Sequence, residues 1–365
     1  TWMSRGSVHV LLQHMDKATA DFEKALALEK NRDKKQDILR KLADAAFAQR
    51  DWDRAQKYYD QLVALDPKNE YLRLEYAQVL IQYKRYEKAL QQYQQLLKLV
   101  GRDTKAKATT LRDIGDLYEK MGQDDEAITT YRKAQKLMKS SHWLSVELEQ
   151  RIVGVYRRTD RLGELIASYE KKWKSPNYTQ AMLLGSLFDE IGREDDALKM
   201  YRRASTKNRR SVDPRVRIIR ILERRGEEKK VIKAYNDLIR IAPRESRYQF
   251  DLVKLYFRLG DRKKAESLLT KIEKRFSRDP DVFVVLADMY MRFDMKKKAL
   301  ATYKKLVRLD PRNDAFILGL GEYYSQSGEI DLAVKTWVKL LDSNLEKFEA
   351  YARLGPVLAE HGLVD

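Results

Sequence analysis

The apolar residues of this chain alternate between two helical stripes joined by a short polar segment. Residues 36–69 show the pattern as two runs, Leu39, Leu42, Ala43 and Ala46 followed by Ala55, Tyr59 and Leu62. Apolar side chains at this spacing share one helix face, so each run predicts an amphipathic helix of about 13 residues. Pro67 marks the end of the second helix, because proline lacks the N–H that a continuing helix needs.

A small residue at the start of the second stripe returns every 34 residues along much of the chain. The series contains Ala55 and Ala89, then Ala197, Val231, Ala265, Ala299 and Ala333. A bulky residue follows four positions later, at Tyr59, Tyr93, Tyr201, Tyr235, Leu269, Tyr303 and Trp337. A fixed period of this length is typical of an array of repeats that bury their apolar faces against one another. The pattern predicts about twenty helices in antiparallel pairs and no β-strands.

This pattern resembles the tetratricopeptide repeat, a helix–turn–helix of 34 residues. Residues 314–347 carry the motif in full, at Leu320, Gly321, Tyr324, Gly328, Ala333 and Trp337. The resemblance covers essentially the whole chain. It implies an all-α fold, a right-handed superhelical solenoid of about ten helix–turn–helix units without a single central core.

The repeat boundaries predict one solenoid over residues 1–365, with a partial repeat at 1–35, full repeats over 36–347 and a partial C-terminal repeat at 348–365. Full repeats are expected at 36–69, 70–103, 108–141, 146–179, 178–211, 212–245, 246–279, 280–313 and 314–347. In the first partial repeat, Ala18, Phe22 and Ala25 match a second helix. Because both ends fall inside repeats and residue 1 is threonine, the chain is expected to be a fragment of a longer solenoid.

Glycines fall at two recurrent places in the repeat. The first place is the turn between paired helices, where a left-handed residue ends the first helix, at Gly122, Gly192, Gly226, Gly260, Gly328 and Gly362. Asp160 and Asp294 take that place in two other repeats, and aspartate tolerates the conformation moderately. The second place is repeat position 8, where paired helices approach most closely, at Gly115, Gly185, Gly321 and Gly355.

Positive charge is concentrated in one part of the chain. The net charge is +18, and residues 199–278 contain 26 Lys and Arg against 10 Asp and Glu, an excess of 16. A single-sign field of this size attracts acidic proteins, nucleic acids or anionic surfaces. The competing interpretation is a solvated helix face without a partner.

Catalytic and metal-binding patterns are not found in the sequence. The chain has no cysteine and four histidines, and His9 and His14 are five apart, which does not place them on one helix face. No carboxylate pair stands out as acid and base. We therefore expect no enzymatic activity, no cofactor and no metal. No run of about 18 apolar residues is present that would predict a membrane span.

The resemblance implies that the first helix of each repeat lines the concave face of the solenoid. Reading off the positions that point into such a groove gives the candidate partner-binding residues Arg151, Arg158, Arg217, Arg220, Arg224, Arg247, Phe250, Lys254, Phe257 and Arg258. Guanidinium groups bind carboxylates and phosphates bidentately, and aromatic rings offer anchoring contacts. The groove over residues 146–258 is thus expected to be the positive face, with a more mixed convex face.

The sequence favours a protein–protein interaction scaffold that binds an acidic or extended peptide segment in this basic groove. The alternative is a nucleic-acid-binding helical-repeat protein that uses the arginine-rich face of residues 146–258. A clamp for a C-terminal carboxylate, known from one subclass of the family, is not expected, because no repeat has asparagine at position 9. Base reading by position 5, as in pentatricopeptide proteins, is not expected either, because apolar residues occupy that position in most repeats.

Two local irregularities carry further expectations. Positions 8 and 20 are both bulky at Val153 and Leu165 and again at Ile219 and Val231, which predicts wider helix pairs in repeats 146–179 and 212–245. Pro356 lies inside the pattern of the last helix, so residues 348–362 are expected to form a kinked or interrupted helix. Its Tyr351, Leu354 and Leu358 should pack on the preceding repeat. The outward apolar face of this helix is expected to permit self-association.

Overall fold

The computed structural model describes residues 1–139, 142–343 and 345–363, and these residues form helices and connecting turns with no β-strand. The chain divides into two compact units, Thr1–Lys172 and Trp173–Asp365. The boundary falls where the sequence places the overlapping repeats 146–179 and 178–211.

The first compact unit contains ten α-helices in its described residues. They are α1 (Trp2–Leu11), α2 (Met15–Leu28), α3 (Arg32–Ala48), α4 (Trp52–Leu65), α5 (Glu70–Gln82), α6 (Tyr86–Leu99), α7 (Thr104–Lys120), α8 (Asp124–Lys136), α9 (Trp143–Arg158) and α10 (Leu162–Lys172). Each odd-numbered helix packs on the even-numbered helix that follows it, as the repeat predicts. The sequence did not reveal α1, which is the first helix of the N-terminal repeat.

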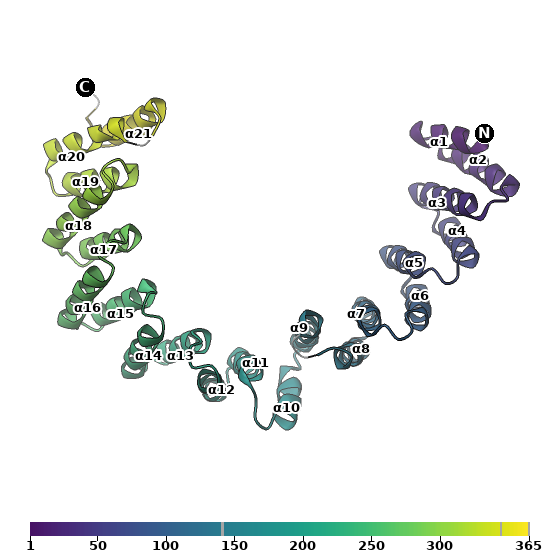
Figure 1. Cartoon of the computed structure of the whole chain (residues 1–365), viewed down its shortest axis with the longest axis horizontal. Coiled ribbons are helices and arrows are strands. Elements are labelled where there is room, and N and C mark those ends of the chain that lie inside the picture. Colours follow the sequence, from purple (N-terminus) through teal and green to yellow (C-terminus); the bar gives the residue numbers. More distant parts are fainter. Residues whose placement is uncertain (140–141, 344, 364–365) are drawn as a thin grey trace. The chain divides into compact units, whose positions relative to one another are not determined.

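The second compact unit contains eleven α-helices and one 3₁₀-helix in its described residues. They are α11 (Tyr178–Glu190), α12 (Glu194–Lys207), α13 (Asp213–Arg224), α14 (Glu228–Ile241), α15 (Ser246–Arg258), α16 (Arg262–Arg275), α17 (Pro280–Arg292), α18 (Lys296–Leu309), α19 (Asp314–Gln326), α20 (Ile330–Trp337), η1 (Val338–Asp342) and α21 (Lys347–Glu360). Figure 1 shows α13, α15, α17 and α19 on one side of this unit and α14, α16, α18 and α20 on the other.

The turns inside the repeats adopt the expected left-handed backbone. All six glycines predicted there have positive φ, between 66° and 78°, and Asp160 and Asp294 have φ of 56° and 54°. Gln13, Arg50 and Lys84 adopt the same conformation without being glycine or aspartate. The turn therefore forms in every one of these repeats, whichever residue occupies it.

Glycine at position 8 makes room for the aromatic ring of the paired helix. A Cβ atom on Gly115 would lie 2.3 Å from the ring of Tyr131, and one on Gly321 would lie 2.1 Å from Trp337. Gly6 has the same relation to Phe22, at 2.6 Å, which identifies α1 and α2 as a repeat. These distances are too short for any side chain, so the helices pack backbone against ring.

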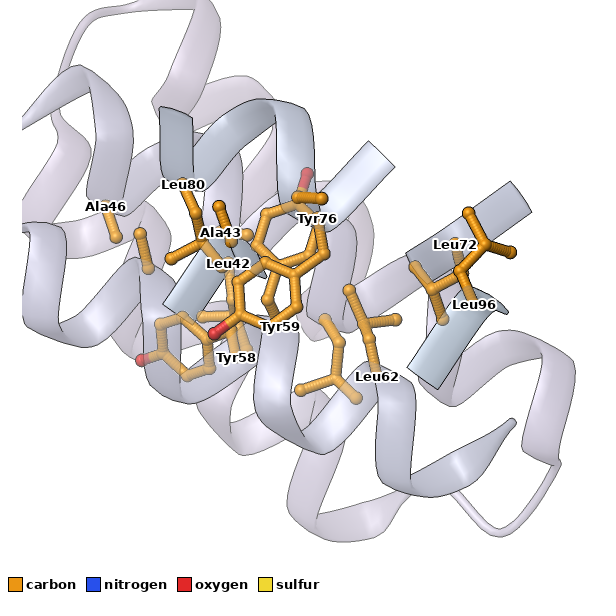
Figure 2. Packing of buried hydrophobic residues seen from close by; sticks show 14 of the residues in the cluster. Leu42, Ala43, Ala46, Tyr58, Tyr59, Leu62, Leu72, Tyr76, Leu80 and Leu96 are labelled. Atoms are coloured by element: carbon orange, nitrogen blue, oxygen red, sulfur yellow. The ribbon is translucent and has the colours of Figure 1, made fainter. Parts of the chain in front are cut away.

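The core of the first compact unit is a continuous layer of aliphatic and tyrosine side chains between successive helices. Figure 2 shows Tyr59 of α4 beside Tyr76 of α5, and the two rings stack with centroids 4.9 Å apart. Leu42 and Leu62 are fully buried in the same cluster. Each tyrosine hydroxyl reaches a carboxylate at the edge of the core, Glu75 for Tyr59 and Asp60 for Tyr76.

The helix pairs with bulky residues at positions 8 and 20 are in contact over less of their length than other pairs, while their predicted wider spacing stays a prediction. Among the full repeats in the described residues, α9 with α10 and α13 with α14 approach each other over the smallest part of their lengths. Ile219 and Val231 are buried between α13 and α14, whereas the small residues Gly321 and Ala333 lie between α19 and α20. The added side-chain volume is the reason to expect wider spacing of the paired backbones.

The C-terminal helix differs from its prediction. The α-helix α21 runs without interruption through Pro356, so the prediction of an interrupted helix is wrong. Pro356 and Ala352 are both exposed, so the carbonyl that loses its donor can reach water. Leu354 is buried as expected, but Tyr351 is 62% exposed and does not pack on the preceding repeat.

Candidate functional site

The predicted binding residues lie in both compact units. Arg151 and Arg158 belong to α9 of the first unit. The others belong to two first helices of the second unit, Arg217, Arg220 and Arg224 on α13 and Arg247, Phe250, Lys254, Phe257 and Arg258 on α15. Of the α13 and α15 residues, Arg217, Arg220 and Arg247 line one cavity.

The two arginines of α9 are engaged by carboxylates of the same compact unit. The guanidinium of Arg151 lies 2.5 Å from Asp116 and 3.0 Å from Glu147. That of Arg158 lies 2.7 Å from Asp124 and 3.1 Å from Glu119, and its hydrogen bonds, the one to Asp124 first, raise its pKa. Both side chains connect one repeat to the next, so a partner would have to compete with existing ion pairs.

Arg224 makes the equivalent inter-repeat contact in the second unit. It donates to Asp189 and lies 3.0 Å from Glu194, whose pKa is lowered by hydrogen bonds from Arg225 and Arg224. Two α15 cations also have neighbours. Lys254 lies 3.3 Å from Asp251, and Arg247 packs over the ring of Tyr248 at 4.6 Å.

Arg217, Arg220 and Arg258 are the candidate cations without an ion pair or side-chain hydrogen bond in the described part of the chain. All three are exposed. Arg217 and Arg220 are one turn apart on α13. An exposed guanidinium that no carboxylate holds keeps its full set of donors for a partner.

A cavity of about 510 Å³ opens beside these two arginines. Its walls come from α11, α13, α14 and α15, and its lining is Met182, Val212, Asp213, Val216, Arg217, Ile219, Arg220, Glu223, Tyr235, Leu238, Arg247, Tyr248 and Asp251. Ligand cavities in proteins span about 300 to 1,000 Å³, with mainly apolar walls and a few polar groups. This cavity is within that size range but is more polar, because three arginines and three carboxylates line it beside apolar residues such as Met182, Ile219 and Leu238.

The cavity follows from the bulky residue at position 8 of α13. In the preceding repeat, Gly185 lets the ring of Tyr201 lie against the α11 backbone, with 2.7 Å between the ring and the place of a Cβ. Ile219 occupies the same position on α13, so Tyr235 cannot close onto the backbone there. Tyr235 instead lines the cavity and donates its hydroxyl to Glu223 at 3.2 Å. Burial raises the pKa of Tyr235.

Two aromatic candidates differ in accessibility. Phe250 is buried, with 4% of its surface exposed, so its expected place on an open binding face is wrong. Phe257 is half-buried and stacks on Phe293, with ring centroids 3.4 Å apart and 10° between the planes. Sequence reasoning also missed Met182 and Tyr235, because a cavity between helices leaves no mark on the repeat pattern.

The expected contrast between a positive concave face and a mixed opposite face stays a prediction, although the second helices of this region are also rich in cations. The first helices α13 and α15 together carry seven Lys and Arg against three Asp and Glu. The second helices α14 and α16 carry ten against four. The excess of positive charge therefore extends over both sides of this region.

Among the described residues, no group of three or more His, Asp or Glu side chains is arranged to hold a metal ion. No described helix is both long and apolar enough to cross a membrane.

Comparison with known proteins identifies the repeat in three models of one family. Models described as tetratricopeptide repeat match residues 46–110, residues 1–32 and 113–138, and residues 250–314, together about half of the chain. No curated protein matches the sequence.

Solved structures similar to this chain include a chain in the structure of Naa15/Naa10 bound to HypK-THB, with 14% identity and a TM-score of 0.41. The match covers 99% of this chain and 66% of that one. Yeast Tom70 matches with 12% identity and a TM-score of 0.32, over 99% of this chain and 96% of Tom70. A tetratricopeptide repeat protein from Parabacteroides merdae matches with 16% identity and a TM-score of 0.34, over 68% of this chain and 97% of that one.

Proposed function

The chain belongs to the tetratricopeptide repeat family of protein-interaction scaffolds, and we propose that its α13–α15 face binds an extended, acidic peptide segment of a partner protein. The observation that carries the proposal is the pair of unengaged guanidinium groups, Arg217 and Arg220, at the cavity lined by Ile219 and Tyr235. Carboxylates of the peptide pair with the arginines, and one apolar side chain enters the cavity.

The charge around the cavity supports an acidic rather than a neutral peptide. Of the three carboxylates in the lining, Asp251 is paired with Lys254, and Glu223 accepts a hydrogen bond from the hydroxyl of Tyr235. The opposing cations Arg217 and Arg220 have none within the described residues. Arg258 on α15, which also has no ion pair in the described part of the chain, adds positive charge beside them.

The test uses immobilised peptides of about 12 residues that vary in the number of acidic residues and in one central apolar residue. The double variant R217E/R220E is compared with K274E/R308E, which makes the same change in charge at the last turns of α16 and α18. Wild-type protein and the control should retain acidic peptides that contain an apolar anchor. R217E/R220E should lose at least about tenfold in affinity for them.

Equal retention by R217E/R220E and wild-type protein would refute this site. Nucleic-acid binding through the arginine-rich face of residues 146–258 is the other outcome of the same experiment. It would appear as displacement of the peptides by an oligonucleotide, with an affinity that falls steeply with salt.

Self-association through the C-terminal helix is a separate part of the proposal. Phe348 and Tyr351 of α21 are 83% and 62% exposed and lie one turn apart. Adjacent exposed aromatic side chains are typical of a contact surface.

A further inference from the structure

The first turns of the second helices change sign along the second compact unit. At the first three helical positions, α12 carries Glu194, Asp195 and Asp196, α14 carries Glu228, Lys229 and Lys230, α16 carries Arg262, Lys263 and Lys264, and α18 carries Lys296, Lys297 and Lys298. The helix dipole favours acidic residues in this turn and disfavours cations. The placement in α16 and α18 therefore opposes the stability of the helices that carry it.

The inter-repeat ion pair of this edge is not repeated in the next two repeats. Arg224, at the end of α13, pairs with Glu194 in the first turn of α12. The equivalent arginines one and two repeats later are Arg258 and Arg292. The position of Glu194 is then occupied by Glu228 and by the cation Arg262, and the described residues show no ion pair for either arginine. Arg258 and Arg292 therefore have no ion pair equivalent to the one between Arg224 and Glu194.

We define the basic edge as the eight cations Arg258, Arg262, Lys263, Lys264, Arg292, Lys296, Lys297 and Lys298. Within residues 257–264 and 292–298 only Asp261 and Asp294 are acidic. Lys264 lies 2.6 Å from Asp261, Lys296 lies 4.0 Å from Asp294, and Arg262 lies 2.8 Å from Glu266 just outside these ranges. Lys263 and Lys297 are exposed, occupy the same repeat position 34 residues apart, and have no ion pair in the described part of the chain.

We propose that the basic edge binds nucleic acid through its phosphate backbone. Five of its eight cations are lysines, which are depleted at protein interfaces but are standard point-charge partners of phosphate. Phe257 and Phe293, each next in sequence to an arginine of the edge, are half-buried and stack on each other, which adds aromatic surface of the kind that nucleic-acid-binding proteins use for base stacking. A lipid surface is disfavoured because residues 257–264 and 292–298 contain no exposed large apolar side chain.

The binding is independent of base sequence, since the edge offers repeated charges and no arrangement of side chains for reading bases. Arg258 is common to this edge and to the peptide site proposed above. The two proposals are nevertheless tested separately, because the residues substituted in this test lie on α16 and α18 and not on α13.

The test measures fluorescence anisotropy of a labelled oligothymidylate of about 30 nucleotides with the full chain. The variant K263E/K297E reverses two exposed, unpaired charges. K274E/R308E makes the same charge change at the opposite ends of the same two helices and serves as the control. Because acidic residues are favoured in the first turn, K263E/K297E should fold at least as well as wild-type protein, which circular dichroism checks.

K263E/K297E should bind the oligonucleotide at least about tenfold more weakly, with a shallower dependence on salt between about 50 and 200 mM. The control and R217E/R220E should bind as wild-type protein does, within about twofold. Equal binding by K263E/K297E and wild-type protein, or equal losses in the control, would overturn the proposal. So would tighter binding of polyglutamate, or of phosphatidylserine vesicles, than of the oligonucleotide.

Discussion

Where repeat position 24 is a tyrosine, the hydrogen bonding of its hydroxyl differs from one repeat to another. Tyr131 donates to Asp116 and Glu119 at 2.5 and 2.6 Å, and Tyr235 donates to Glu223. The hydroxyl of Tyr201 is buried and has no hydrogen-bond partner. Burial raises the pKa of Tyr201 to about 12, so the group stays neutral at physiological pH. A buried hydroxyl without a partner is an energetic cost that the repeat carries.

Removing this hydroxyl should therefore stabilise the protein. We expect Tyr201→Phe to raise the free energy of unfolding by about 1 kcal/mol, because the desolvation penalty disappears and the ring is kept. Tyr131→Phe is the matched variant, and it should lower the free energy of unfolding by about 1 kcal/mol. Urea unfolding followed by circular dichroism measures both. A Tyr201→Phe variant as destabilised as Tyr131→Phe would contradict the assignment of an unpaired hydroxyl.

At this scale the sequence predicts which residues are buried far better than which charges are available. Small and aromatic residues at fixed positions identify the contact of Gly321 with Trp337, because one repeat determines both. Whether an arginine is engaged depends on the preceding repeat: Arg224 pairs with Glu194, whereas Arg217 has no ion pair among the residues that the structure describes. Position 5 is partly exposed at Val216 but buried at Phe250, so a position rule could not place that ring.

At the scale of helices, the pairs α9–α10 and α13–α14, which are in contact over less of their length than other pairs, should be the first to open. Backbone amides exchange their protons with solvent when the helix opens locally. Opening is easier where fewer side chains pack between the two helices of a pair. We expect amides of α14 to exchange at least about tenfold faster than those of α12 and α18. Hydrogen–deuterium exchange read by mass spectrometry resolves these segments. Uniform protection across α12, α14 and α18 would contradict this expectation.

The helix boundaries were predictable where glycine, aspartate or proline marks a turn. Positive φ at Arg50 and Lys84 was not, since a repeat imposes that turn even on a residue that disfavours it. The continuity of α21 through Pro356 was not predictable either, because the cost of proline depends on whether the freed carbonyl is buried, and a sequence does not give its exposure.

At the scale of the whole molecule, the exposed aromatic pair Phe348 and Tyr351 should make association depend on concentration. We expect sedimentation analysis of wild-type protein to show reversible dimers as concentration rises, and F348S/Y351S to remain monomeric with unchanged helicity. Val284→Ser/Val285→Ser, which removes another exposed apolar pair on α17, is the control. Dimerisation that persists in F348S/Y351S would place the contact elsewhere.

The charge of the first turn changes from one second helix to the next, so the two ends of the basic edge differ. Their three-residue charges are −3 on α12, +1 on α14, +3 on α16 and +3 on α18. The acidic residues of α12 are paired with Arg193, Arg224 and Arg225, so an anionic strand that diffuses along this edge meets little net charge near α12 and is attracted to α16 and α18. A surface that binds nucleic acid of any sequence can thus still have a preferred end: a strand that slides along the edge is held most strongly at α16 and α18.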